Sequence, residues 1–455
     1  MLKRDKPSKS SISAKRKKAV WDQKLILSSC FPSSFYAIAL DLSPYDILFK
    51  SNGDGLIMDV FVQILLGIAL GAIALIFLIW VIFEQQYRRR DGNKMELDQG
   101  AWHIKEYTPE TYQLQGIFTA FNDTKKLDIF LTEIDIELVL LSKDSLEGIT
   151  HTVKITSRHP DQISGQNPSR LDNYWESYIV KGKHTTQVEV AIAIHGKNLT
   201  GLETAWVKAH YVVYGPGGRT PKTRHCIIPL KFPDENAPKR WRSTDGADVL
   251  PIRTHLLSPI DSIVEVVQRY VVPQAQKGDI VTIGESPVAI IQGRMIHPSE
   301  VKPGWLAKRL CYYFLPTSSL ATACGLQVLV DNSGAWQVGF AFVIGAIAKG
   351  LFKIPGVFYM LAGEQAKLID DVTGTLPPYD QFIVLGPANS QAVVDEILAQ
   401  TGLEAAIVDV NDLKRVAILA ATPNATQDLL NKALLNNPAG NAAEQTPVVL
   451  IRPSS

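Results

Sequence analysis

The pattern of apolar and polar positions divides the chain into three parts, and the first is a long apolar run. Val60 to Phe83 contains no charged residue. At about 1.5 Å per residue, a helix of this length outspans a hydrocarbon core of about 30 Å. We therefore predict one transmembrane helix over residues 58–87. A cleavable signal peptide is the alternative, but the run is too long, and Glu84–Tyr87 is not a small-residue cleavage site.

The second part, residues 100–235, alternates apolar and polar residues with a period of two. Polar, glycine and proline residues separate seven such segments: 112–121, 127–141, 150–156, 174–180, 187–194, 205–214 and 226–232. This alternation is typical of half-buried strands and predicts an all-β, sandwich-like domain. The polar segment 236–247 is predicted to be a linker.

The third part, residues 248–455, mixes helical and strand-like segments, which predicts an α/β (α+β) domain. Pro259 to Tyr270 and Ser390 to Gln400 have helical spacing. Ile280–Ile283 and Val288–Ile291 are predicted as two strands around a turn, and Ala405–Val410 as a further strand that ends near Asp409.

Two uncharged runs within the third part, 310–330 and 334–348, raise the possibility of a membrane hairpin. Pro316 and Asp331 interrupt or end the first run, and the second is short and rich in glycine. A buried helix and strand of the α/β core is therefore the preferred prediction.

Charge and composition decide among partners. The chain has 46 Lys and Arg against 45 Asp and Glu, a net charge of +1, so we expect no nucleic-acid partner. Residues 1–57 begin with a lysine-rich stretch and are predicted to be a disordered basic tail, or else a polybasic membrane-binding arm. Met58 is an alternative start. The four cysteines show no metal-ligand spacing.

The flanks of the apolar run predict its orientation. Arg88, Arg89 and Arg90 follow it, whereas Asp54 and Asp59 lie on its other side. Under the positive-inside rule, the large C-terminal part is expected in the cytoplasm. The chain is thus predicted to be a single-pass membrane protein whose one helix contacts the lipid bilayer.

Two stretches carry a family resemblance. Residues 278–294, G-D-I-V-T-I-G-E-S-P-V-A-I-I-Q-G-R, and residues 407–413, I-V-D-V-N-D-L, resemble segments of coenzyme F-420-0:gamma-glutamyl ligases. The resemblance implies GTP-dependent, Mg²⁺- or Mn²⁺-dependent ligation of L-glutamate to a deazaflavin-type acceptor, and a homodimer. The chain departs from the family pattern at Ala289, Ile290 and Gln292.

The resemblance also assigns candidate site residues. The nucleotide-binding candidates are Arg253, Thr254, Glu285, Ser286, Gly293 and Arg294. Asp409, with Asp370 or Asp371, is the candidate metal set. For Asp409, capping of a following helix is the ordinary alternative. For the whole chain, the alternatives to a ligase are a membrane-tethered binding or adaptor protein that keeps the ligase fold, and a purely structural role for the β domain.

Overall fold

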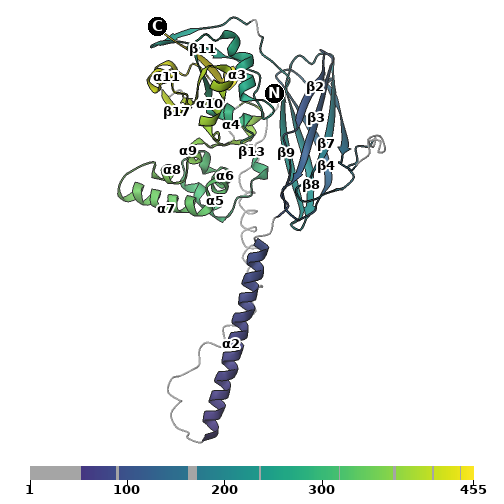
Figure 1. The fold of residues 1–455 in the computed structure, drawn as a ribbon, viewed down its shortest axis with the longest axis vertical. Coiled ribbons are helices and arrows are strands. Elements are labelled where there is room, and N and C mark those ends of the chain that lie inside the picture. Colours follow the sequence, from purple (N-terminus) through teal and green to yellow (C-terminus); the bar gives the residue numbers. More distant parts are fainter. Residues whose placement is uncertain are drawn as a thin grey trace, which may run out of the picture. The chain divides into compact units, whose positions relative to one another are not determined.

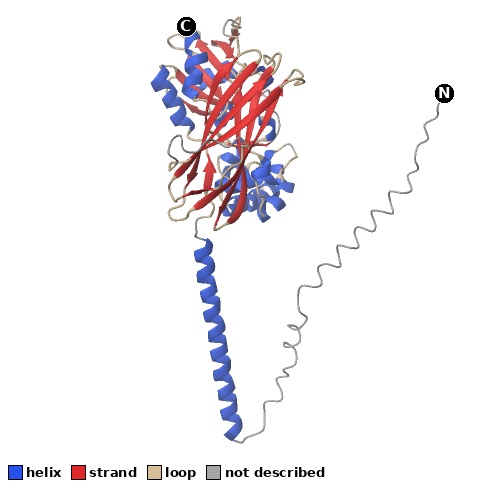
Figure 2. Cartoon of the chain, turned by 90° about the vertical axis from the view of Figure 1, so that its right-hand side faces the viewer, coloured by secondary structure: helices blue, strands red, loops and turns tan. Residues whose placement is uncertain are grey.

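The computed structural model describes residues 53–88, 92–161, 172–234, 237–316, 318–371, 376–411, 414–440 and 442–454. The chain forms two compact units, residues 1–90 and residues 91–455. The described part of the first unit is the single helix α2 (Gly53–Arg88), visible in Figures 1 and 2. Val60–Tyr87 of this helix is long and apolar enough to cross a membrane. Residues 1–52 of the predicted tail lie outside the described residues.

The second unit begins with two antiparallel sheets (Figure 1). One sheet consists of β1 (Met95–Leu97), β3 (Thr111–Asn122), β7 (Thr185–His195) and β5 (Thr150–Arg158) in that order, with β2 (Ala101–Tyr107) also paired to β3. The strands of the other sheet are, in order, β6 (Tyr178–Val180), β4 (Ile129–Ser142), β8 (Leu202–Gly215) and β9 (Gly218–Pro229). Phe118 and Val190 from the first sheet share one buried core with Leu131 and Val213 from the second. The predicted sandwich-like β domain is therefore confirmed.

A six-stranded sheet organises the C-terminal region. Its order is β10 (Arg242–Thr244), β11 (Ala247–Ile252), β18 (Val448–Pro453), β12 (Ile280–Gly284), β16 (Glu404–Asn411) and β17 (Arg415–Ala421). Alternate residues of these strands point to opposite faces. Helices α3 (Ile263–Tyr270) and α10 (Ser390–Thr401) pack on one face, and α11 (Gln427–Leu434) packs on the other. The region is thus mixed α and β, as predicted.

A smaller, mostly helical part is inserted after β12. It has a three-stranded sheet of β13 (Met295–Ile296), β15 (Ile383–Val384) and β14 (Asp370–Asp371). Its α-helices are α5 (Trp305–Leu310), α6 (Ala323–Ser333), α7 (Ala335–Leu351), α8 (Val357–Leu361) and α9 (Gln365–Leu368). The short 3-10 turns of the C-terminal region are η1 (Val272–Gln274), η2 (Pro298–Glu300), η3 (Cys311–Tyr313), η4 (Ser319–Ala321), η5 (Tyr379–Gln381) and η6 (Ala442–Glu444). Residues 323–351 therefore form two helices, and the predicted strand in this stretch is wrong.

One further local prediction is wrong, and so is one of the alternatives. Val288–Ile291 lies in helix α4 (Glu285–Ile291), not in a strand, because a short buried apolar run has no periodicity that separates the two structures. Gly293, with a φ of 68°, follows this helix and allows the chain to turn away. Asp409 lies within β16 opposite Ala417 of β17. Because a hairpin partner and not a helix follows, Asp409 is not a helix cap.

The β domain and the C-terminal region share a small aromatic core. Trp206 and Ile227 from the β domain pack with Ala289, Tyr379 and Phe382. The Tyr379 hydroxyl is fully buried and donates a hydrogen bond to the Leu257 carbonyl at 2.7 Å. The two parts are therefore joined by packing as well as by the chain.

An ionisable pair lies at the same junction. Trp206 Nε1 donates to His225 Nδ1 at 3.2 Å, and His225 Nε2 lies 3.7 Å from Glu300 Oε1. His225 also stacks on His297, with ring centroids 4.9 Å apart. Burial lowers the pKa of His225 to about 3 and raises the pKa of Glu300 to about 6. The junction therefore favours a neutral imidazole.

Candidate anion-binding site

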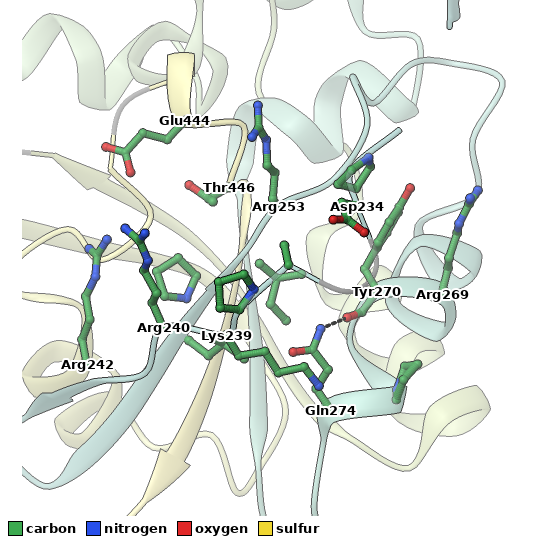
Figure 3. Close-up of a pocket in the computed structure, with 17 residues that line it drawn as sticks. Asp234, Lys239, Arg240, Arg242, Arg253, Arg269, Tyr270, Gln274, Glu444 and Thr446 are labelled. Atoms are coloured by element: carbon green, nitrogen blue, oxygen red, sulfur yellow. Dashed lines mark hydrogen bonds between the residues drawn. The ribbon is translucent and has the colours of Figure 1, made fainter. Parts of the chain in front are cut away.

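A basic cavity of about 740 Å³ opens beside the six-stranded sheet (Figure 3). The segment before β10, the end of β11, the end of α3 and the residues before β18 surround it. Five cationic side chains line it: Lys239, Arg240, Arg242, Arg253 and Arg269. Asp234 and Glu444 are the two carboxylates in its lining. The excess of positive charge suits an anionic ligand.

The sequence around Trp241 explains why basic side chains gather here. Trp241 packs against the core beneath α3 and lies under the Arg452 guanidinium, 4.4 Å from its ring centroid. In an extended chain, neighbouring side chains point to opposite sides. Arg240 and Arg242 therefore point away from the core side on which Trp241 packs, and both line the cavity.

Strand pairing brings Arg253 to the cavity from the other side. β11 pairs with β18 as far as Ile252 and Val448, and the Thr254 amide donates to the Gln445 carbonyl at 3.0 Å. Arg253 lies between Ile252 and Thr254 and faces residues 444–446. Its Nη2 atom is 3.5 Å from Gln445 Oε1, which is a long contact. Arg269 comes from the last turn of α3, where a cation is also favoured by the helix dipole.

The partners that the structure describes for Arg242, Arg253 and Arg269 carry no charge. Arg242 donates to the Pro438 carbonyl at 3.3 Å, and Arg269 lies over the Phe232 ring at 4.9 Å. Across the described ranges, none of the five basic lining residues forms an ion pair with a carboxylate. Arg452, by contrast, has a carboxylate partner: its Nε and Nη2 atoms donate to the two Asp279 carboxylate oxygens at 3.0 Å and 2.7 Å. Planar guanidinium groups without a carboxylate partner are suited to phosphate.

Of the six residues predicted to bind nucleotide, Arg253 lines the cavity. Thr254 is buried, and its hydroxyl donates to the His255 carbonyl at 2.8 Å. Glu285 and Ser286 begin α4, and Gly293 and Arg294 follow its end. The Arg294 Nε donates to the Gly386 carbonyl at 2.6 Å. The structure therefore does not gather the six residues around this one cavity.

The candidate metal residues lie on two different sheets. Asp409 belongs to β16 of the six-stranded sheet, and Asp370 and Asp371 form β14 of the three-stranded sheet. The side chains of Asp370 and Asp371 lie outside the described residues. Within the part of the chain that the structure describes, no group of three His, Cys, Asp or Glu side chains is placed to hold a metal ion. The metal set stays a prediction.

Lys239, Arg240, Arg242 and Arg269 were not predicted as site residues. Three of them belong to the K-R-W-R run at 239–242. Proline and polar residues lie beside this run, and for that reason the segment resembles a linker. Three cations within four residues, around one tryptophan, were the signal that could have identified the segment. Arg269 offered no signal, because a basic residue in the last helical turn is common.

Comparisons with known proteins identify the β domain. Residues 96–232 match the family model of the F420-0:gamma-glutamyl ligase N-terminal Ig-like domain. The β domain is therefore Ig-like. The match is consistent with a relation to the family that the sequence resembles, but it includes no residue of the C-terminal region, where that resemblance lies. No curated protein matches the chain.

Solved structures resemble the chain only weakly. The GAE domain of GGA2p from Saccharomyces cerevisiae has 9% identity and a TM-score of 0.19, over 31% of this chain and 96% of that one. A yeast GGA1 GAE domain has 12% identity and a TM-score of 0.18, over 31% of this chain and 96% of that one. A family 123 glycoside hydrolase from Clostridium perfringens has 8% identity and a TM-score of 0.16, over 30% of this chain and 26% of that one. Scores this low carry no functional argument.

Proposed function

We propose that this chain, whose Ig-like domain is of the F420-0:gamma-glutamyl ligase type, is a membrane-anchored protein that binds GTP through the basic cavity of its C-terminal region. The observation that carries the proposal is the group of five cationic side chains around one cavity, without carboxylate partners among the described residues. A triphosphate presents several negative charges within a few ångströms, which is the ligand that such a group recognises best.

In the ligase reaction that we propose, GTP transfers its γ-phosphoryl group to a carboxylate of the deazaflavin-type acceptor, and GDP leaves. The amine of L-glutamate then attacks the acyl phosphate, and phosphate leaves as the amide forms. Phosphoryl transfer needs positive charge around the phosphate oxygens. Arg240, Arg242 and Arg253 are the residues that we assign to this task. A Mg²⁺ or Mn²⁺ ion, for which Asp409 with Asp370 or Asp371 stays the predicted set, would supply further charge neutralisation.

A second candidate function, GTP binding without ligation, is favoured by the positions that depart from the family pattern. Ala289 and Ile290 are buried in the aromatic core at the junction. The side chain of Gln292 donates through Nε2 to the Ala388 carbonyl and accepts through Oε1 from the Ala388 backbone N–H. These three positions therefore serve packing and a backbone contact, and none presents an unpaired polar group to a substrate.

GTP binding to the purified full chain in detergent micelles tests the proposal. We expect the Arg240→Ala/Arg242→Ala double variant to bind at least about 100-fold more weakly, because each charge-assisted contact contributes about 1.5–3 kcal/mol. The matched control is Lys105→Ala/Lys197→Ala, which removes two exposed cations of the β domain that do not line the cavity. Equal affinity of the two double variants would contradict the proposal. Glutamate incorporation into a deazaflavin acceptor then distinguishes a ligase from a binding protein.

A further inference from the structure

Helix α7 has a stripe of apolar residues that is exposed to solvent. Its exposed residues Trp336, Phe340, Val343, Ile347 and Leu351 recur every three or four positions and so form one face, which we call the α7 face. Trp336 is 93% exposed and Leu351 is 75% exposed. The opposite side of the helix packs on the core through Val338 and Ala341. A surface helix of a soluble protein is ordinarily polar on its outer face, so this face indicates a partner.

Aromatic residues next to α7 are exposed as well. Tyr313 contacts Phe342 of α7, with ring centroids 5.5 Å apart, yet it is largely exposed, and its neighbour Tyr312 is 85% exposed. Phe352 and Ile354 continue the exposed apolar surface beyond the end of α7. Figure 1 shows α7 at the edge of the C-terminal region, beside α8. The partner surface must therefore accept a broad apolar and aromatic area.

The charges around the α7 face are almost all positive. Residues 301–363 contain five cationic residues, Lys302, Lys308, Arg309, Lys349 and Lys353, and one acid, Asp331. Asp331 accepts a hydrogen bond from Gln327 at 2.7 Å. Arg309 lies over the Trp305 ring at 4.4 Å. None of the five cations forms an ion pair with a carboxylate of the described residues. The partner is therefore expected to be anionic.

The geometry of the two central helices argues against a transmembrane hairpin. α6 and α7 are bent by 114° at Gly334. Residues 325–330 of α6 are buried in the core of the helical part, so this helix is not available to lipid. α7 alone has 17 residues, which is at the lower limit of the lengths that cross a bilayer. An apolar face with aromatic residues and basic neighbours is instead typical of a helix that lies in the plane of a membrane interface.

We propose that the α7 face docks on an anionic lipid bilayer, with its apolar side chains among the acyl chains and Lys308, Arg309 and Lys353 at the phosphates. Tryptophan and tyrosine are enriched at this depth of a membrane. The chain also carries α2, which is long and apolar enough to cross a membrane. A helix anchored in the bilayer keeps the α7 face at a high effective concentration near lipid.

A second copy of the chain fits the charges less well. In a symmetric dimer, the same surface patch contacts itself. Lys353, which follows the stripe, would then face a surface of the same sign, with Asp331 as the only acid in residues 301–363. Anionic phosphates neutralise this cation, and this complementarity favours the bilayer.

Depth-dependent quenching on the full chain in proteoliposomes tests the proposal. An environment-sensitive fluorophore is attached to Phe340→Cys, or independently to Val343→Cys, in a Cys30→Ser/Cys324→Ser background, since Cys226 and Cys311 are buried. The vesicles contain phosphatidylcholine with 30% phosphatidylglycerol, and a nitroxide on the acyl chain is the quencher. Lys197→Cys, at an exposed position of the loop that follows β7 in the β domain, is the control.

We expect strong quenching at positions 340 and 343 and none at 197. Pure phosphatidylcholine, or the Lys308→Ala/Lys353→Ala variant, should weaken the quenching several-fold, because each basic residue near an anionic surface strengthens binding. Two results would overturn the proposal. One is an aqueous emission spectrum without quenching at both positions, and the other is efficient 340-to-340 cross-linking without quenching, which would identify a second copy as the partner. GTP affinity does not enter this readout.

Discussion

Acidification should weaken the junction between the β domain and the C-terminal region through His225. Burial lowers the pKa of His225 to about 3, well below its ordinary value. Below about pH 6.5 the unfolded chain takes up a proton at this residue and the folded chain does not, so stability falls as the pH falls from about 6.5 towards 3. At pH 5 the loss amounts to about 2 kcal/mol of unfolding free energy.

Glu300 opposes this effect. Its pKa is raised to about 6, so the folded chain takes up the proton first and stability rises as the pH falls through about 6 towards 4.5. The Glu300 side chain is about one third exposed, and solvent reduces its contribution to below about 1 kcal/mol. Burial also lowers the pKa of His297, which acts in the same direction as His225. The net result at pH 5 is a loss of about 1 kcal/mol or more.

Thermal unfolding of the full chain, followed by tryptophan fluorescence at pH 7.5 and pH 5, measures the effect. His225→Asn retains an acceptor for Trp206 Nε1 but cannot be protonated. Its Tm should fall about 4 °C less than that of the wild type between the two pH values. His103→Asn, at an exposed position of β2, is the control and should behave like the wild type. Equal falls in the wild type and in His225→Asn would refute the reasoning.

The remaining predictions concern stability, orientation and domain independence. Asp279→Ala should cost about 3 kcal/mol in chemical denaturation, because Asp279 is buried and holds Arg452 through two contacts. Asp428→Ala, in an exposed pair with Lys432, should cost far less, and similar costs would contradict this. We expect a tag after Ser455 to be protected from external protease in sealed cells, and cleavage without lysis would overturn the proposed cytoplasmic placement. Residues 92–234 should fold alone with a β-type circular dichroism spectrum, because their core is self-contained; a helix-dominated spectrum would count against it.

The β domain could be predicted well because each strand has one buried and one exposed face. β3, for example, alternates buried positions such as Tyr112, Leu114 and Phe118 with more exposed ones along its whole length. β2 was missed because it packs few of its side chains, so its sequence shows no alternation. β1 was missed because three residues are too short for a periodic pattern.

The C-terminal region was harder to predict because several of its segments are buried on more than one side. The apolar run of α4 could have been a strand or a helix, and tertiary packing decided for the helix. α7 is apolar both where it contacts the core and where it faces solvent, so composition alone suggested burial. The six-stranded sheet joins β18 to β11 and β12 from more than 160 residues away, a pairing that local patterns do not contain.

The basic cavity shows the same limit. Arg253 was predicted from a family resemblance, and the structure brings it together with basic residues from a supposed linker and from the end of α3. The grouping depends on strand order and on the packing of Trp241, both of which are properties of the folded chain. Individual basic residues are visible in a sequence, but their convergence on one cavity is not.

The most direct test of GTP binding at this cavity is the dissociation constant of full chain and GTP at fixed ionic strength, compared among the wild type, Arg253→Ala and Lys197→Ala. Arg253 lines the cavity, whereas Lys197 is an exposed cation of the β domain. We predict that Arg253→Ala weakens binding about tenfold or more and that Lys197→Ala changes it less than about twofold. Wild-type protein that does not bind GTP, or an Arg253→Ala variant that binds as tightly as the wild type, would contradict the assignment of the cavity.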